Sequence, residues 1–278
     1  MARVALVTGT NLSAPDPDEP LLLAALAARG VDARMIAWDD PATPVERGDV
    51  VVIRSTWNYV PRRAAFLAWT QAAAAIASVW NPVDVIADNT DKAYLVTLAT
   101  RGVPVIPTVI VRSGSLGRIL ASRGWDDVIV KPRVGAASFA TRRFRRDELA
   151  EGERFLAEAL AEREMLVQPY ARAVESSGER ALVWIDGALT HAVRKERRLD
   201  GDEERVSEAV PIADDERALA EQVIDGAKLL YARIDVVRDE RGAPRLMELE
   251  LVEPSLFLEQ SEAALHRFAD AIGRLARV

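Results

Sequence analysis

A pair of extended stretches near the C-terminal end, residues 231–238 and 245–255, constrains this chain more than any other feature. In the first stretch, Arg233 and Asp235 alternate with apolar residues, which is the period of a strand with both charges on one face. The connection at 239–244 contains Gly-Ala-Pro, a turn signal between two strand-like runs. The two stretches are therefore predicted to form a β-hairpin.

The predicted hairpin would gather acidic side chains from both arms. Glu248, Glu250 and Glu253 alternate with apolar residues on the second arm, so Asp235 would lie across from Glu248 and Glu250. Like charges on one sheet face repel each other unless a cation lies among them. Mg²⁺ accepts carboxylate oxygens and leaves positions for water and phosphate. The hairpin thus predicts a magnesium site; the alternative is a solvated acidic face with Arg233 as its counter-ion.

Composition narrows the class of protein. The chain has 278 residues, enough for one large or two smaller domains, and its net charge of −7 without a long basic run argues against a nucleic-acid partner. The absence of cysteine excludes disulfides, thiolate metal sites and a cysteine nucleophile. No signal-peptide core and no apolar run near membrane-spanning length is present. We expect a soluble cytoplasmic protein with no membrane partner.

The N-terminal third alternates strand-like and helix-like segments, which indicates parallel βαβ units. Ligands of such sheets lie beyond the carboxyl ends of the strands, so residues 8–11 and 54–59 are candidate ligand loops. Neither GxGxxG nor GxxxxGK[ST] follows the first strand. The predicted strands are 4–7, 33–38, 50–53 and a short one at 79–82, and the predicted helices are 20–29 and 62–77.

The remainder of the chain also reads as mixed α and β structure. Asp186-Gly187 between two strand-like runs is a strong hairpin signal. The small residues of 133–141 predict a mobile loop, and the charged residues of 197–208 predict another. Further strands are expected at 109–111, 128–132, 165–170, 180–185 and 189–195, and helices at 93–101, 116–123, 146–162, 214–230 and 259–278.

Motifs in residues 89–255, taken together and in order, resemble those of the ATP-grasp ligases of the glutathione-synthetase type. The resemblance implies an α/β fold with an N-terminal parallel α/β domain at 1–87 and two α+β subdomains, 88–167 and 168–278, that clamp ATP. The matching segments are Asn89-Thr-Asp-Lys92, Arg101-Gly-Val-Pro-Val-Ile-Pro-Thr108, Val130-Lys-Pro132, Val167-Gln-Pro-Tyr170, Gly178-Glu-Arg180, Ile185-Asp-Gly187, Ala192-Val-Arg-Lys195, Ala232-Arg-Ile-Asp235 and Met247-Glu-Leu-Glu250.

The resemblance implies a nucleotide site. Lys92 and Lys131 would bind phosphates through their ammonium groups, the alternative for each being a surface lysine. A glycine-containing loop would offer backbone N–H groups and close over the phosphates, unless it is an ordinary surface turn. The backbone around Gln168 and Tyr170 would hold adenine, and Glu179, rather than Glu175, the ribose. The loop residues assigned to this role are Gly135, Ala136 and Ser138.

The resemblance also implies the catalytic positions. Asp235, Glu248 and Glu250 match the magnesium ligands of the family, and Glu250 stands where many members carry asparagine, which leaves one or two ions open. Arg233 matches the arginine that faces the acyl phosphate. Arg194 and Lys195 would face phosphate or substrate, unless they form an exposed strand end. His191 is expected to be a packed histidine rather than a base.

These parts imply a reaction. ATP would phosphorylate a substrate carboxylate, with Mg²⁺ and lysines neutralising the charge, and a nitrogen nucleophile would then displace phosphate. No protein nucleophile is needed, in agreement with the absence of cysteine. Closure of the loop at 133–141 would keep water from the acyl phosphate.

The N-terminal segments resemble the branch of the family that forms cycloserine from an O-ureido-serine. This implies a small amino-acid-like substrate held by Arg54, Ser55, Trp57 and Ser255. The first alternative is intermolecular ligation of an amino acid or peptide to an amine. The second alternative is a catalytically silent nucleotide-binding module. Family habit suggests a homo-oligomer.

Overall fold

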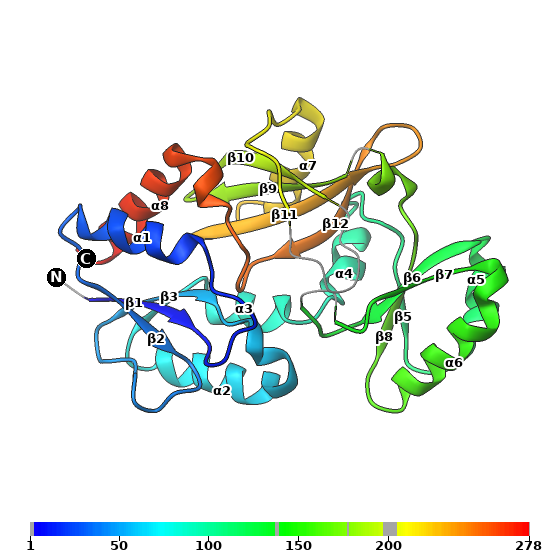
Figure 1. Cartoon of the computed structure of the whole chain (residues 1–278), viewed down its shortest axis with the longest axis horizontal. Helices are drawn as coiled ribbons and strands as arrows, with labels where there is room; N and C mark the ends of the chain where they lie inside the picture. Colours follow the sequence, from blue (N-terminus) through cyan, green and yellow to red (C-terminus); the bar gives the residue numbers. More distant parts are fainter. Residues whose placement is uncertain (1–2, 137–138, 177, 197–204, 278) are drawn as a thin grey trace.

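The structure is a computed structural model, and it describes residues 3–136, 139–176, 178–196 and 205–277. It contains three sheets with helices packed on their faces (Figure 1). The N-terminal sheet is parallel, with the strand order β2-β1-β3-β4, which confirms the predicted βαβ arrangement. Its strands are β1 (Val4–Thr8), β2 (Ala33–Ala37), β3 (Val50–Ser55) and β4 (Ser78–Trp80).

Helices cover both faces of the N-terminal sheet because its central strands are apolar on both sides. Alternate residues of β1 and β3 pack with α1 on one face and with α2 and α3 on the other. Helix α3 was not predicted. The elements are α1 (Asp18–Ala27), α2 (Arg63–Ala74), α3 (Val83–Asn89) and the short 3-10 helix η1 (Trp57–Arg62) directly after β3.

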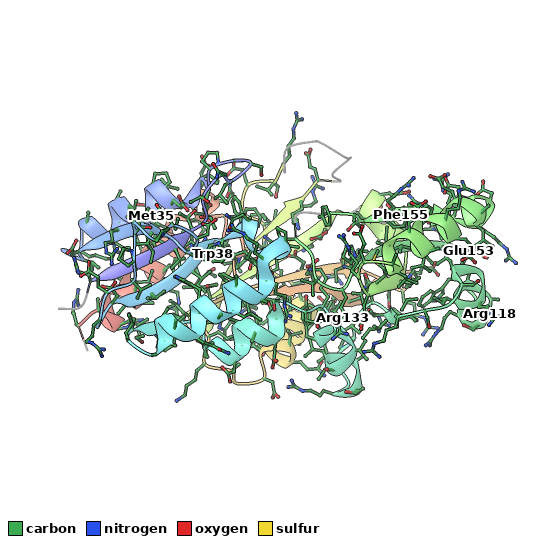
Figure 2. All side chains as sticks on the ribbon, turned by 90° about the horizontal axis from the view of Figure 1, so that it is seen from below. Met35, Trp38, Arg118, Arg133, Glu153 and Phe155 are labelled. Carbon is green, nitrogen blue, oxygen red and sulfur yellow. The ribbon has the colours of Figure 1, made fainter. Side chains whose placement is uncertain are left out.

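The middle sheet is antiparallel, with the order β5-β8-β6-β7. Helices α5 and α6 share its core, and β7 was not predicted. Figure 2 shows Arg118, Glu153 and Phe155 of this unit at one end of the molecule and Met35 and Trp38 of the N-terminal unit at the other. The elements are β5 (Val109–Val111), α5 (Leu116–Arg123), β6 (Asp127–Pro132), β7 (Arg142–Arg145), η2 (Arg146–Glu148), α6 (Leu149–Leu160) and β8 (Met165–Pro169).

The C-terminal sheet is antiparallel, with the order β10-β9-β11-β12, and contains both predicted hairpins. Asp186 and Gly187 adopt φ values of 47° and 83°, the left-handed conformation that a tight hairpin turn requires. One face packs with α1 and α8, and the other with α4 and α7. The elements are α4 (Tyr94–Thr100), η3 (Arg172–Glu175), β9 (Glu179–Ile185), β10 (Ala188–Lys195), α7 (Asp214–Ile224), β11 (Tyr231–Arg238), β12 (Pro244–Glu250), η4 (Leu258–Gln260) and α8 (Glu262–Leu275).

Several boundaries differ from the predicted ones. Helix α7 ends at Ile224 instead of 230, because Asp225 and Gly226 adopt left-handed conformations. In the predicted loop at 197–208, residues 197–204 lie outside the described residues, and Val206 forms a bridge with Lys195. Within the described ranges, no helix is long and apolar enough to cross a membrane.

Candidate active site

Strands β11 and β12 place four charged side chains on one face of the C-terminal sheet. The register pairs Asp235 with Glu248, as the hairpin pattern predicted, and it pairs Arg233 with Glu250, which was not predicted. Opposed residues of an antiparallel pair share a face, and so do residues two apart on one strand. Strand β12 ends at Glu250, so Glu253, expected on the same arm, lies on the segment that follows it.

Asp235 is the centre of this cluster and is 1% exposed. Its Oδ1 accepts from Arg233 Nε at 2.9 Å, its Oδ2 accepts from Arg233 Nη2 at 3.0 Å, and Lys195 Nζ lies 3.2 Å from Oδ2. Burial alone would raise the pKa of Asp235, but the charges of Arg233 and Lys195 outweigh burial and hold the pKa well below its usual range. Asp235 is therefore an anion that fixes two cations.

Glu248 receives two lysines from the middle part of the chain. Lys92 Nζ lies 2.5 Å from Glu248 Oε1, and Lys131 Nζ lies 3.8 Å from Oε2. Burial opposes ionisation of Glu248, but the two ammonium groups lower its pKa to about 2. Burial and the charge of Lys92 lower the pKa of Lys131. The two predicted phosphate-binding lysines thus meet at one carboxylate.

Glu250 and Glu179 complete the cluster. Glu250 Oε1 accepts from Arg233 Nη2 at 2.5 Å, and Glu179 Oε1 accepts from Lys195 Nζ at 2.6 Å. Burial raises the pKa of Glu250 to about 7, with Asp235 adding to the effect and Arg233 opposing it. Burial also raises the pKa of Glu179. Burial is therefore the main cause of the raised pKa of both glutamates, and each of them has a cation as its ion-pair partner.

The donor set suits magnesium in its chemistry, since Asp235, Glu248 and Glu250 offer only carboxylate oxygens. Among the residues that the structure describes, however, no three acidic or histidine side chains converge closely enough to enclose an ion. Their oxygens accept from Arg233, Lys195 and Lys92 instead. Binding of an ion would therefore require these cations to move toward the nucleotide phosphates.

The predicted phosphate loop begins beside the lysines. Lys92 Nζ donates to the Gly135 carbonyl at 2.7 Å, and the Ala136 carbonyl accepts from the backbone of Phe139 at 3.0 Å. Ser138 lies outside the described residues. The first part of the loop thus contacts the same lysine that pairs with Glu248.

The predicted adenine segment lies at the end of β8. Gln168 is buried, pairs with Ile129 across the sheet, and donates from Nε2 to Thr108 Oγ1 at 2.9 Å. The Arg143 guanidinium lies 3.5 Å from the centroid of the Tyr170 ring. Side chains of this segment are thus fixed by the middle sheet.

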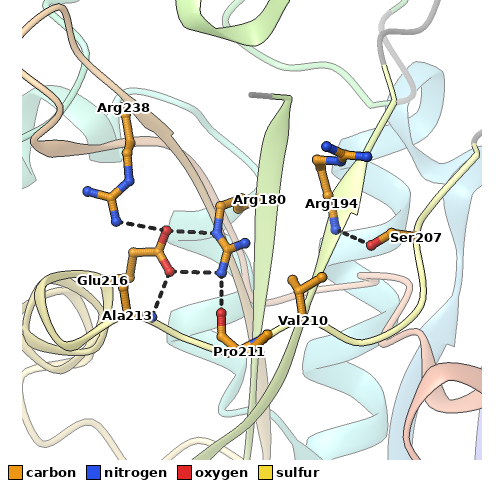
Figure 3. A pocket seen from close by; sticks show the side chains of 8 residues that line it. All are labelled: Arg180, Arg194, Ser207, Val210, Pro211, Ala213, Glu216 and Arg238. Carbon is orange, nitrogen blue, oxygen red and sulfur yellow. Dashed lines mark hydrogen bonds and ion pairs between the residues drawn. The ribbon is translucent and has the colours of Figure 1, made fainter. Parts of the chain in front are cut away.

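Arg194 does not join the cluster, contrary to expectation. Adjacent residues of a strand point to opposite faces, so Lys195 reaches Asp235 whereas Arg194 lines a pocket of about 570 Å³ beside the start of α7. Figure 3 shows Arg180 and Arg238 converging on Glu216 in that pocket, with Arg194 on its other side. Arg194 thus lies on the face opposite to the cluster, and its predicted contact with phosphate or substrate stays a prediction.

Two of the predicted substrate residues are buried. Arg54 is 1% exposed; its Nη2 donates to the Pro254 carbonyl at 3.2 Å and lies 3.5 Å from Asp16 Oδ2. Ser55 is fully buried and donates to Thr8 Oγ1 at 2.7 Å. Both side chains are enclosed by other parts of the chain in this conformation, and their direct binding of substrate stays a prediction.

The other two lie closer to the site. The Trp57 indole donates to the Glu253 carbonyl at 3.0 Å, and Ser255 is half-buried two residues further on. His191 is packed as expected, with Nε2 3.1 Å from the Phe257 carbonyl and Nδ1 3.0 Å from Thr190 Oγ1. Burial lowers the pKa of His191.

Tyr59 and Glu253 belong to this region and were not assigned to the site from the sequence. Burial raises the pKa of Glu253 to about 8, with Glu250 adding to the effect, and burial also raises the pKa of Tyr59, with Glu253 adding to that effect. Glu253 stood in the acidic pattern of the hairpin, which was the available signal. Tyr59 stood in the candidate ligand loop at 54–59, but the 3-10 helix that positions it was not predicted.

The three sheets and the charged face between them define an ATP-grasp ligase, an enzyme class that forms carbon–nitrogen bonds. Solved structures support this class at the level of the fold. The ATP-grasp ligase PsnB, solved with a minimal precursor, Mg and ADP, is 20% identical and has a TM-score of 0.68 over 99% of this chain and 98% of that one. D-alanine–D-alanine ligase from Bacillus anthracis is 14% identical, with a TM-score of 0.73 over 100% and 98%.

Sequence similarity identifies the family of the chain within this enzyme class. The cycloserine biosynthesis protein DcsG of Streptomyces lavendulae is 33% identical over 98% of both chains. The crystal structure of D-cycloserine synthetase DcsG has a TM-score of 0.88, 33% identity, and coverage of 99% of this chain and 100% of that one. The family profile for the N-terminal domain of D-cycloserine synthetase DcsG matches residues 4–81. The chain belongs to the D-cycloserine synthetase family, which confirms the predicted resemblance.

Proposed function

We propose that this ligase uses ATP to activate the carboxylate of an O-ureido-serine-like amino acid and closes it on a nitrogen of the same molecule to give cycloserine. The observation that carries the proposal is the 33% identity to a cycloserine biosynthesis protein over 98% of both chains. The match extends through the N-terminal domain, whose Trp57 donates to the Glu253 carbonyl. The N-terminal domain would therefore contribute to substrate choice, and the two other sheets to the ATP site.

In this proposal, the hairpin holds the metal and the lysines hold the nucleotide. Asp235, Glu248 and Glu250 would bind one or two Mg²⁺ ions, which supply charge neutralisation at the phosphates. Lys92 and Lys131, now paired with Glu248, would turn to the phosphates when these are present. The support is the position of both lysines at the same carboxylate.

The other nucleotide contacts follow the sequence motifs. Backbone N–H groups of Gly135 and Ala136, with Ser138 beyond them, would cradle the phosphates. The backbone at Gln168 and Tyr170 would hold adenine, and Glu179 the ribose. The ranges 1–87, 88–167 and 168–278 remain the proposed division into domains. Helix α4 lies in the second of these ranges, but its Leu95 belongs to the core of the C-terminal sheet.

The chain's own residues would serve the acyl transfer as follows. The substrate carboxylate takes the γ-phosphoryl group of ATP, releasing ADP. Arg233 and Lys195, both fixed by Asp235, face the position where the acyl oxygen becomes negative, and their charges stabilise it. The substrate nitrogen then forms the C–N bond and loses its proton, and inorganic phosphate leaves with the electron pair of the broken C–O bond. Because cycloserine carries no carbamoyl group on this nitrogen, water must also cleave the nitrogen–carbamoyl bond, which releases carbamate.

The test is Mg²⁺-dependent ADP release across a panel of amino acids that includes O-ureido-D-serine and its L enantiomer. We expect turnover with one ureido-serine alone and a cyclic product in stoichiometric amount. Turnover that requires an added amine would replace cyclisation by intermolecular ligation. Absence of ADP release with every carboxylate would leave a nucleotide-binding module.

A further inference from the structure

One face of β6 carries the polar side chains of that strand. Asp127, Ile129 and Lys131 alternate along it, while Val128 and Val130 between them are buried in the core of the middle sheet. Asp127 therefore lies on the same face as Lys131, about 13 Å from it along the strand. This face has room for nucleotide phosphates at the lysine end and for the base at the other end.

The proposed adenine segment begins in the sheet and then leaves it. Gln168 pairs with Ile129, and the backbone N–H of Tyr170 donates to the Asp127 carbonyl at 2.8 Å. Beyond Tyr170 the chain leaves β8 and enters the 3-10 helix η3. The conformation of residues 168–171 therefore depends on side-chain contacts as well as on strand pairing.

A single guanidinium connects this segment to the sheet at two points. Arg143 of β7 donates from Nε and Nη2 to the two carboxylate oxygens of Asp127, at 2.8 and 2.6 Å, and from Nη1 to Glu175 Oε1 at 2.8 Å. Its Cζ atom lies 3.5 Å from the centroid of the Tyr170 ring. The bidentate pair with Asp127 fixes the direction of the guanidinium. Arg143 thus holds the start of the segment through Tyr170 and the end of η3 through Glu175.

We infer that Arg143 is a positioning residue of the nucleotide site, and that it holds the segment from Gln168 to Tyr170 in the conformation that selects adenine over guanine. The inference rests on the proposed function, because it requires the backbone of this segment to bind the base. Adenine carries an amino donor at the position where guanine carries an oxygen acceptor. A carbonyl held in one place distinguishes these groups, whereas a mobile segment presents a carbonyl to one base and an N–H group to the other.

The experiment measures Kd for Mg-ADP and for Mg-GDP by calorimetry. We expect wild type to bind Mg-ADP about 50-fold more tightly than Mg-GDP. In Arg143→Ala, Kd for Mg-ADP should rise by about tenfold and Kd for Mg-GDP should stay nearly unchanged, so the preference falls to about fivefold. Arg143→Lys keeps the charge without the planar fork, and it should lose most of the preference as well.

Matched controls separate base selection from folding. Arg142 precedes Arg143 on β7, lies on the opposite face and pairs with Glu151, so Arg142→Ala should keep both Kd values within about twofold of wild type. Tyr170→Leu removes the ring below the guanidinium and should lower the preference. Adding Tyr170→Leu to Arg143→Ala should lower it little further, because both substitutions remove the same contact.

Three outcomes would overturn the inference. An Arg143→Ala protein with the wild-type Kd for Mg-ADP would show that the segment keeps its conformation without the guanidinium. Equal rises in the two Kd values would show a general loss of the nucleotide site instead of a loss of base selection. A wild type that binds Mg-ADP and Mg-GDP equally tightly would show that the segment does not select the base.

The proposed function fails in a different way. Both Kd values are measured without an amino acid. A wild type that binds Mg-ADP but releases no ADP from ATP with any carboxylate therefore rejects the ligase reaction, while the two Kd values still decide the role of Arg143. A wild type that binds neither nucleotide rejects the nucleotide site and the role of Arg143 together.

Discussion

Asp235 binds two cations that belong to different strands, Arg233 on its own strand and Lys195 on β10. Asp235→Asn would remove the charge that holds both, as well as a carboxylate oxygen from the proposed metal site. We expect Mg²⁺-dependent ADP release to fall by about 100-fold or more. The measurement is kcat/KM with saturating Mg-ATP.

Glu240→Gln is the matched control for this substitution. Glu240 is exposed in the turn between β11 and β12, and its replacement should leave ADP release within about twofold of wild type. Near-normal activity of Asp235→Asn would contradict the assignment of the metal and catalytic groups. A melting temperature recorded for both variants separates loss of chemistry from loss of fold.

Asp16 gives a prediction about stability and pH. It is 1% exposed, and burial raises its pKa from 3.8 to about 6, although Arg54 opposes the shift. Between these values the folded protein binds more protons than the unfolded chain, so the contribution of Asp16 to stability is present at low pH and lost as pH rises through about 6. The wild-type free energy of unfolding, minus that of Asp16→Asn, should fall by about 3 kcal/mol between about pH 3.5 and pH 7. Urea unfolding at several pH values measures it, and a constant or rising difference would contradict it.

The same residues show what a sequence can reveal of a site. Strand periodicity places Asp235, Glu248 and Glu250 on one face, because the rule is local and the turn fixes the register. The burial of Arg54 could not be predicted, because its partners, Asp16 and Asp18, precede it by more than thirty residues and reach it only in the fold. Charge at a strand end does not say whether the partner is a ligand or another part of the chain.

At the scale of the element, strong local sequence patterns were sufficient to predict helices and strands, and weak patterns were not. The hairpin at Asp186-Gly187 and helix α5 follow from turn chemistry and helical spacing. Strand β7 consists of Arg142–Arg145, and only Phe144 among its residues is buried, so it becomes a strand by pairing with β6. Its pairing partner, not its own composition, decides its structure.

Helix α6 contains a glycine that packs closely against neighbouring side chains. A Cβ on Gly152 would lie 2.6 Å from Leu116 Cδ2 and 3.1 Å from Phe144 Cγ. Alanine favours a helix by about 1 kcal/mol over glycine, but overpacking typically costs about 1–3 kcal/mol. We expect Gly152→Ala to lower the free energy of unfolding by about 1 kcal/mol.

The control for this prediction lies on the same helix. Glu158 is exposed, and Glu158→Ala should change the free energy of unfolding by less than about 0.5 kcal/mol. Urea titration of both variants measures the difference. Stabilisation by Gly152→Ala would mean that α5 and α6 separate easily, and it would refute the close contact between them.

At the scale of the whole molecule, the N-terminal and C-terminal sheets share one core. Helices α1 and α8 pack between residues of both sheets, and they lie next to each other in Figure 1. The Tyr231 hydroxyl lies 2.7 Å from the Ile53 carbonyl and 2.8 Å from the Val252 carbonyl, so β11 contacts the end of β3 directly. Tyr59 and Trp57 follow β3 directly, so this junction sets their position relative to the charged face.

Asn81 is a fully buried polar residue at the same junction between the two sheets. Its Nδ2 donates to the carbonyls of Tyr231 at 2.9 Å and Leu251 at 2.8 Å, and its Oδ1 accepts from the backbone of Leu230 at 2.8 Å. Asn81→Ala would leave three backbone groups buried without partners, each costing about 1 kcal/mol or more. We expect the free energy of unfolding to fall by about 3 kcal/mol in urea titration.

The consequence for catalysis follows from geometry, since Asn81 bonds to β11 and to Leu251, the residue directly after β12, where the hairpin meets the N-terminal domain. Loosening this junction should shift Trp57 and Tyr59 relative to Glu253, while Asp235 and Lys195 stay within one sheet. In Asn81→Ala, KM for the amino-acid substrate should therefore rise by about tenfold, and KM for Mg-ATP should change by less than twofold. Gln71→Ala, on the exposed face of α2, should alter neither. Equal increases in both KM values would show that the junction supports the nucleotide site as well as the substrate site.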